Sequence, residues 1–210
     1  MSKELYEAII NGDMKTAFAA TDKALTAKAD PMELVQKYMI SAMNEVGRRF
    51  ECEEYFVPEM LLSARAMKAA LGLVRPLLTA SGTQPTGRVV IGTVKGDLHD
   101  IGKNLVASML EGAGFEVIDL GTDVSSDEFV KAVSEKQPHV VCLSALLTVT
   151  MPSMKTTIEA LQQAGVREQV KVLVGGAPIT RRFADEIGAD GYGENAVAAV
   201  TEARKLVQVN

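Results

Sequence analysis

The sequence has no tryptophan and few cysteines, histidines and prolines, and these shortages exclude several kinds of protein. Its two cysteines, Cys52 and Cys142, are too few and too far apart for a disulfide framework or a CxxC zinc site, so a reducing cytoplasm is the expected location. The sequence also lacks a signal-peptide-like start and any apolar stretch long enough to span a membrane. With 47% hydrophobic and 23% charged residues, the composition is typical of a globular protein.

Positive charge is also scarce. The 210 residues include 22 Lys and Arg against 27 Asp and Glu, which gives a net charge of -5. Binding to nucleic acid phosphates requires clustered Lys and Arg, so we expect neither a nucleic acid nor a membrane as a partner.

Helical periodicity fills the first part of the chain. Breaks at residues 11–13, 29–31 and 53–58 divide residues 2–80 into four helices, with Asp30 as an expected N-cap and Pro58 in the first turn of the last helix. Short connections imply an antiparallel bundle. Residues 81–87 then lose all periodicity and are rich in Gly, Ser, Thr and Pro, which indicates a linker. We therefore expect a helical domain over residues 1–84 and a second domain over residues 85–210.

Short β-branched runs alternate with helical patterns in the second part. The alternation predicts five parallel strands covered by helices on both faces, in a doubly wound α/β domain. If the strand order is flavodoxin-like, 2-1-3-4-5, ligands should bind beyond the carboxyl ends of the first and third strands, where the winding reverses. The expected strands cover residues 88–94, 116–120, 139–146, 170–174 and, more weakly, 190–192.

The first of these two loops contains one of the two histidines in the chain. His99 follows Asp97 at a spacing that lets the carboxylate bind one ring nitrogen and leave the other available as a metal ligand. Gly96 and Gly102 permit close backbone approach. The alternative is that His99 is an ordinary loop or helix-cap residue.

Two further loops should meet this one at the same sheet edge. Ser144, after the third strand, suggests a relay from His99 through Asp97 to Ser144, although Ser144 and Thr148 are equally typical of a strand end. Gly175 and Gly176 follow the fourth strand, where paired glycines also suit a simple turn. The coincidence of all three features is more specific than each feature alone.

The pattern Asp97-x-His99-x-x-Gly102, followed by Ser144-x-Leu146 and Gly175-Gly176, resembles the cobalamin-binding domain of methionine synthase, B12-dependent mutases and corrinoid proteins of methyltransferase systems. The helical part, including residues 43–47 and 54–60, is similar to the helical cap of the methyltransferase branch. The resemblance thus implies a four-helix bundle cap followed by a flavodoxin-like, Rossmann-type five-stranded parallel sheet.

The resemblance implies a cobamide cofactor, methylcobalamin or a related corrinoid, bound base-off with His99 as the lower axial ligand of cobalt. Phe56, Met60 and Met67 are candidates for covering the corrin ring, with ordinary bundle core as the favoured alternative because such residues normally just pack. The implied cofactor site on the second domain consists of Val94, Gly96, Asp97, Leu98, His99, Asp100, Ile101, Gly102, Ser144, Leu146, Thr148, Gly175, Gly176, Ala177, Gly191, Tyr192 and Gly193.

The implied function is that of a methyl carrier in one-carbon metabolism. It would pass a methyl group on cobalt from a substrate:corrinoid methyltransferase to a corrinoid:acceptor methyltransferase, without being a complete enzyme by itself. A reductive activator is left open as a further partner. Two alternatives also stay open: the small subunit of an adenosylcobalamin-dependent mutase, and a cobalamin-dependent sensor or regulator.

Overall fold

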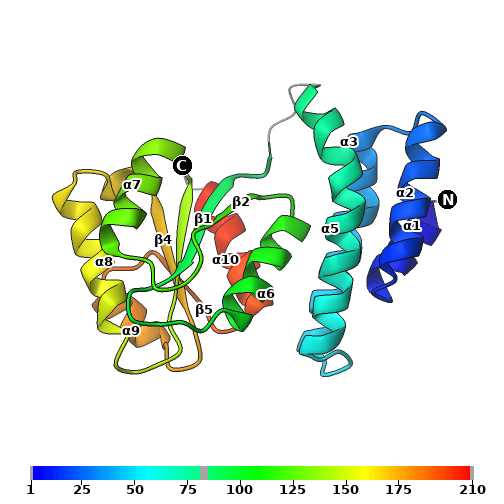
Figure 1. Cartoon of the computed structure of the whole chain (residues 1–210). Helices are drawn as coiled ribbons and strands as arrows, with labels where there is room; N and C mark the ends of the chain where they lie inside the picture. The colour runs from blue at the N-terminus through cyan, green and yellow to red at the C-terminus, as the bar shows by residue number, and fades with distance from the viewer. Residues whose placement is uncertain (1, 81–84, 209–210) are drawn as a thin grey trace. The chain divides into compact units, whose positions relative to one another are not determined.

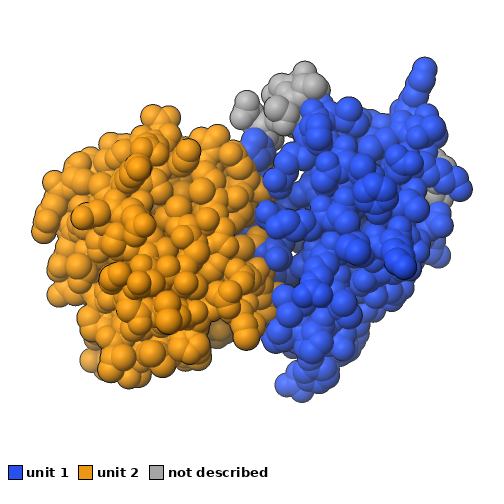
Figure 2. All heavy atoms as spheres, in the orientation of Figure 1, with its two compact units in different colours: residues 1–85, 108–114 blue, residues 86–107, 115–210 orange. Residues whose placement is uncertain are grey.

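The computed structural model describes residues 2–80 and 85–208, and residues 81–84 of the expected linker lie outside the described part. The chain divides into two compact units (Figure 2). Unit 1 consists of Met1–Pro85 and Ser108–Gly114, and unit 2 consists of Thr86–Ala107 and Phe115–Asn210. No helix of the described residues combines the length and the apolar character that crossing a membrane requires.

The N-terminal region is helical, as the periodicity predicts. The expected cap is present: the side chain of Asp30 accepts a 2.9 Å hydrogen bond from the backbone N–H of Met32. Pro58 lies in the first turn of the last helix, where its missing N–H costs nothing. The helices are α1 (Ser2–Ile10), α2 (Met14–Thr26), α3 (Pro31–Glu33), a π-helical segment (Leu34–Met39) that runs on into α4 (Ile40–Glu51), and α5 (Val57–Ala80).

Unit 2 is built on a five-stranded, all-parallel sheet in the order β2-β1-β3-β4-β5, which is the flavodoxin-like order. Figure 1 shows α7, α8 and α9 on one face of the sheet and α6 and α10 on the other. The strands are β1 (Arg88–Thr93), β2 (Glu116–Asp119), β3 (Val140–Ser144), β4 (Lys171–Gly175) and β5 (Gly191–Gly193). The helices of this region are α6 (Ile101–Gly112), α7 (Ser126–Lys136), α8 (Pro152–Gln163), α9 (Arg181–Glu186) and α10 (Ala196–Gln208), with a 3-10 turn at Arg167–Gln169.

The two faces of the sheet carry different side chains. Val141 and Leu143 of β3 join the hydrophobic core beneath α7 and α8. Their alternating neighbours point to the α6 and α10 face, because successive side chains of a strand project to opposite faces. Strand register arranges this second face in two rows. The inner row is Ile91, Cys142, Leu173 and Gly191, and the outer row, nearer the carboxyl edge, is Thr93, Ser144, Gly175 and Gly193.

Candidate functional site

The loop after β1 turns sharply and places Asp97 beneath the neighbouring loop. Gly96 adopts a φ of +86°, which favours glycine, and its N–H donates a 2.8 Å hydrogen bond to Asp123. The hydroxyl of Thr93 donates to the carbonyl oxygen of His99 at 2.9 Å and fixes the far end of the loop. Asp97 is fully buried as a result.

The buried carboxylate of Asp97 has hydrogen-bond donors on both oxygens. Oδ1 lies 2.7 Å from Nδ1 of His99 and accepts the backbone N–H of the same residue at 3.1 Å. Oδ2 accepts from the N–H of Leu146 at 2.7 Å, the N–H of Leu147 at 3.3 Å and the hydroxyl of Thr150 at 2.7 Å. Burial alone raises the pKa of Asp97, but the donors of Leu146, Thr150 and His99 outweigh it and hold that pKa well below its usual range. The carboxylate is therefore ionised at neutral pH.

An ionised carboxylate can only accept, so Nδ1 of His99 carries the proton that lies between them. The lone pair of the neutral ring then resides on Nε2, which has no hydrogen-bond partner among the described residues. The side chain of His99 is 50% exposed. The arrangement leaves an oriented imidazole with one nitrogen available to a metal.

Among the described residues, no hydrogen bond joins the expected relay partner Ser144 to Asp97, and Thr150 supplies the hydroxyl instead. The reason is the register: Ser144 pairs with Thr93 inside the sheet and faces the α6 and α10 side, whereas Asp97 lies below the turn that follows β3. Thr150 is buried although it is polar, and the adjacent Val149 is exposed although it is apolar. The sequence alone does not show this reversal, because it depends on how the turn folds.

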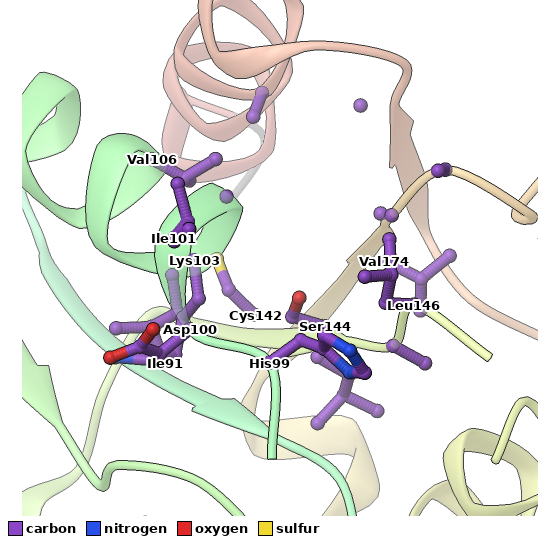
Figure 3. Close-up of a pocket in the computed structure, with 18 of the residues that line it drawn as sticks. Ile91, His99, Asp100, Ile101, Lys103, Val106, Cys142, Ser144, Leu146 and Val174 are labelled. Carbon is purple, nitrogen blue, oxygen red and sulfur yellow. The ribbon is translucent and has the colours of Figure 1, made fainter. Parts of the chain in front are cut away.

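A cavity of about 510 Å³ opens at the carboxyl edge of the sheet beside His99 (Figure 3). It lies on the face covered by α6 and α10, which contribute Val106 and Ala199 to its wall. Such a volume and a mostly apolar wall are typical of small-molecule sites. The cavity is lined by Ile91, Leu98, His99, Asp100, Ile101, Gly102, Lys103, Val106, Cys142, Leu143, Ser144, Ala145, Leu146, Leu173, Val174, Gly175, Gly176, Ala177, Gly193, Glu194, Asn195 and Ala199.

The glycines at the ends of β4 and β5 let backbone segments approach one another. A Cβ on Gly176, whose φ is +135°, would lie 1.8 Å from the carbonyl oxygen of Ala145. A Cβ on Gly175 would lie 2.8 Å from the carbonyl oxygen of Gly193. The glycines therefore pack the strand ends together, and Gly175 and Gly193 line the cavity without side chains of their own.

Most of the predicted site residues line this cavity, but six residues of the second domain do not. Asp97 lies beneath His99, and Gly96 turns the loop. Val94 belongs to the core on the opposite face. Thr148 is exposed outside the cavity.

The last two predicted residues outside the cavity belong to β5. The space beside Gly191 is filled by Leu173 and Leu206, so this glycine makes room for side chains of the chain itself. Tyr192 packs against the core, with the guanidinium of Arg181 5.5 Å from its ring centroid.

The predicted cap residues differ from one another in exposure. Phe56, just before α5, is 61% exposed, whereas Met60 and Met67 have essentially no exposed surface. Their burial favours the bundle-core alternative for Met60 and Met67. Sequence reasoning also missed several cavity residues. The apolar ones look like ordinary core of a strand or helix, and no motif marks Lys103, Glu194 and Asn195. The missed residues are Ile91, Lys103, Val106, Cys142, Leu143, Ala145, Leu173, Val174, Glu194, Asn195 and Ala199.

Large apolar side chains are exposed on the segments that carry His99 and the donors to Asp97. Leu98 is 74% exposed and Val149 is 80% exposed, and Ile101, Leu146 and Leu147 are exposed as well. Leu98 lies in the loop after β1, and Ile101 begins α6. Leu146, Leu147 and Val149 lie in the segment after β3, which supplies the donors to Oδ2 of Asp97. An apolar patch of this kind around a polar group marks a binding surface.

Family models match both parts of the chain. A model described as a B12 binding domain matches residues 87–201, and a second model with the same description matches residues 1–75.

Curated relatives match over nearly the whole length. The trimethylamine corrinoid protein of Methanosarcina barkeri is 46% identical over 97% of this chain and 94% of its own. The dimethylamine corrinoid protein of the same organism is 44% identical over 98% of this chain and 96% of its own.

Solved structures agree with these relatives. A cobalamin-binding protein from Desulfitobacterium hafniense DCB-2 is 34% identical, with a TM-score of 0.80 over 98% of both chains. A chain of the methanol:cobalamin methyltransferase complex from Methanosarcina barkeri is 28% identical, with a TM-score of 0.88 over 100% of this chain and 80% of that one.

Proposed function

Because the chain belongs to the B12-binding corrinoid protein family, we propose that it carries a methyl group on a bound cobamide between two methyltransferases. The observation that carries this proposal is the imidazole of His99, with Nδ1 held by Asp97 and Nε2 free, at the edge of a 510 Å³ cavity. When bound, the cobamide supplies a cobalt centre that accepts and donates the methyl group.

The residues present fit a corrinoid bound base-off. His99 offers one nitrogen ligand, and the apolar side chains around it suit the flat face of a macrocycle. The cavity beside His99 would hold the nucleotide tail of a cobamide whose own base is off the metal. Ser144, Gly175 and Gly193 of the outer row line the cavity and present no large side chain to the tail.

The chain's own residues control the proton on the imidazole. With a metal on Nε2, the Nδ1 proton would stay on His99 and would face the carboxylate of Asp97. The buried anion of Asp97 would thereby fix the tautomer and the direction of the ring.

We further propose that the methyl donor is a methylated amine, because trimethylamine and dimethylamine corrinoid proteins match the chain at 44–46% identity over almost its full length. The partners are then a substrate:corrinoid methyltransferase and a corrinoid:acceptor methyltransferase, with a reductive activator as a third. We assign residues 1–84 as the cap and 85–210 as the corrinoid domain. Two free cysteines are compatible with a cytoplasmic location.

Reconstitution tests the function. The chain refolded with methylcobalamin or hydroxocobalamin should bind one cobamide and show corrin absorption. Chain loaded with hydroxocobalamin and reduced to the Co(I) state with Ti(III) citrate should then gain label from 14C-trimethylamine or 14C-dimethylamine in the presence of the matching methyltransferase, and gain less from 14C-methanol with the methanol enzyme. A chain that stays colourless would overturn corrinoid binding. Native protein carrying an adenosyl upper ligand would favour the mutase alternative, and preferred labelling from methanol would overturn the amine assignment.

A further inference from the structure

The inner end of the cavity is formed by one row of side chains across the sheet. Ile91, Cys142 and Leu173 lie side by side in register on β1, β3 and β4, and each is at most 4% exposed. Val106 of α6 and Ala199 of α10 close the cavity on the helical side. We call these five residues the floor. Figure 3 shows the sulfur of Cys142 among the side chains that line the cavity.

The floor offers a ligand no free polar partner except a thiol. The backbone groups of Ile91, Cys142 and Leu173 are engaged in the sheet, since each residue is paired with strands on both sides. Burial raises the pKa of Cys142 to about 12, so its sulfur stays a neutral thiol, a weak donor and acceptor.

Three polar side chains of the wall lie outside the floor, and two of them bond to other groups. The ammonium of Lys103 donates to Asp119 at 2.5 Å and to Asn104 at 2.7 Å. Asn195 caps α10 by accepting the N–H of Ala198 at 2.9 Å. Ser144 belongs to the outer row, one step closer to the mouth. The five floor residues are thus apolar apart from the Cys142 thiol, and the polar side chains of the wall, Glu194 included, lie outside the floor.

Building on the proposed function, we propose that the floor makes the chain select cobamides by their lower base. It favours an apolar arene such as dimethylbenzimidazole over a purine such as adenine. The tail enters past the outer row, and its terminal base reaches the floor. A purine brings an exocyclic amine and extra ring nitrogens that lose water there without gaining partners. The methyl groups of dimethylbenzimidazole instead pack against Ile91, Cys142 and Leu173.

The test measures dissociation constants of the full chain for two cobamides, cobalamin and its adenine-containing counterpart. Both are supplied as dicyano forms, in which the base is already off the cobalt. We expect the wild-type chain to bind cobalamin at least about tenfold more tightly, which corresponds to one unsatisfied polar group. Equal or reversed affinities would overturn the proposal while leaving corrinoid binding intact. Failure of both cobamides to bind would instead overturn the proposed function.

Two variants place a hydroxyl in the floor from opposite sides. Cys142→Ser acts from the sheet and Val106→Thr acts from α6, and both nearly conserve volume. Each should lower the preference for dimethylbenzimidazole by about fivefold, the effect of one neutral hydrogen bond. Cys52→Ser is the matched control because Cys52 is exposed and belongs to the other unit. This variant should prefer cobalamin over the adenine-containing cobamide as strongly as the wild type does. If Cys142→Ser fails to fold, Val106→Thr still tests whether the floor selects the lower base. If folded Val106→Thr prefers cobalamin over the adenine-containing cobamide as strongly as the wild type does, the floor does not select the base.

Discussion

The hydroxyl of Thr150 donates a 2.7 Å hydrogen bond to Oδ2 of Asp97, the oxygen opposite the one that holds His99. The carboxylate is therefore fixed from both sides and cannot rotate away from the imidazole without losing a buried donor. The orientation of His99 depends on a residue that does not touch it.

Replacing Thr150 should loosen this arrangement. Thr150→Val keeps the shape of the side chain but leaves the buried carboxylate with fewer donors, which should lower the free energy of unfolding by about 1–3 kcal/mol. Thr148→Val is the matched control, since Thr148 is exposed and lies outside the network, and it should change stability by less than about 0.5 kcal/mol. Chemical denaturation of both variants measures the difference. Equal stabilities would show that the Thr150 bond contributes nothing.

Low pH should reduce the free energy of unfolding through protonation of Asp97. Its pKa is depressed in the folded state, so its contribution to stability is complete above the unfolded value of about 3.9 and is lost as pH falls towards the folded pKa. The gap in unfolding free energy between wild type and Asp97→Asn should therefore be widest near neutral pH and narrow below about pH 4. Urea unfolding at several pH values measures the gap. Asp127→Asn, which alters an exposed carboxylate, should show no such narrowing, and a constant gap for Asp97→Asn would contradict the assignment.

The axial ligand can be identified by spectroscopy. Protein grown with 15N-histidine and loaded with unlabelled corrinoid should show, in its Co(II) electron paramagnetic resonance spectrum, nitrogen splitting that changes from the 14N to the 15N pattern. His99→Ala should abolish the protein-derived splitting, while His139→Ala should retain it, because the Nδ1 of His139 accepts the N–H of Arg88 at the far end of the strands. A 14N pattern that stays unchanged in the 15N-histidine protein would mean that the cofactor's own base, not His99, is the nitrogen ligand.

The backbone contact at Gly176 should tolerate no side chain. Gly176→Ala combines an unfavourable φ with a Cβ 1.8 Å from the carbonyl oxygen of Ala145, so it should cost about 3 kcal/mol or more and reduce cobamide affinity. Gly188→Ala has a φ of +76° but open space around it, so strain alone should cost about 1–2 kcal/mol. Thermal unfolding compares the two variants. Equal losses would show that backbone strain, not the contact, accounts for the effect.

The helical region and the parallel sheet could be predicted from the sequence because both depend on local periodicity. Asp30 behaves as the expected cap, and the strand order follows the flavodoxin-like pattern. The weak final strand also forms, although it extends from Gly191 to Gly193 and so begins one residue later than expected.

Side-chain direction was harder to predict. Ser144 and Thr150 are both hydroxyl residues near the end of β3, and spacing alone does not reveal which of them reaches Asp97. Cys142 resembles core because it is buried, yet it faces a cavity. Such distinctions depend on how a turn folds over its neighbour, which is a property of tertiary packing.

The separation in sequence of the groups around Asp97 imposes an order on biosynthesis. The donors to its Oδ2 lie 49, 50 and 53 residues further along the chain, in the loop after β3. A nascent chain that has emerged only as far as α6 contains His99 but none of those three donors. β3 and the turn ending at Thr150 must therefore be synthesised before the buried carboxylate can acquire these donors. A product terminated before that turn contains His99 and Asp97 but lacks all three donors to Oδ2.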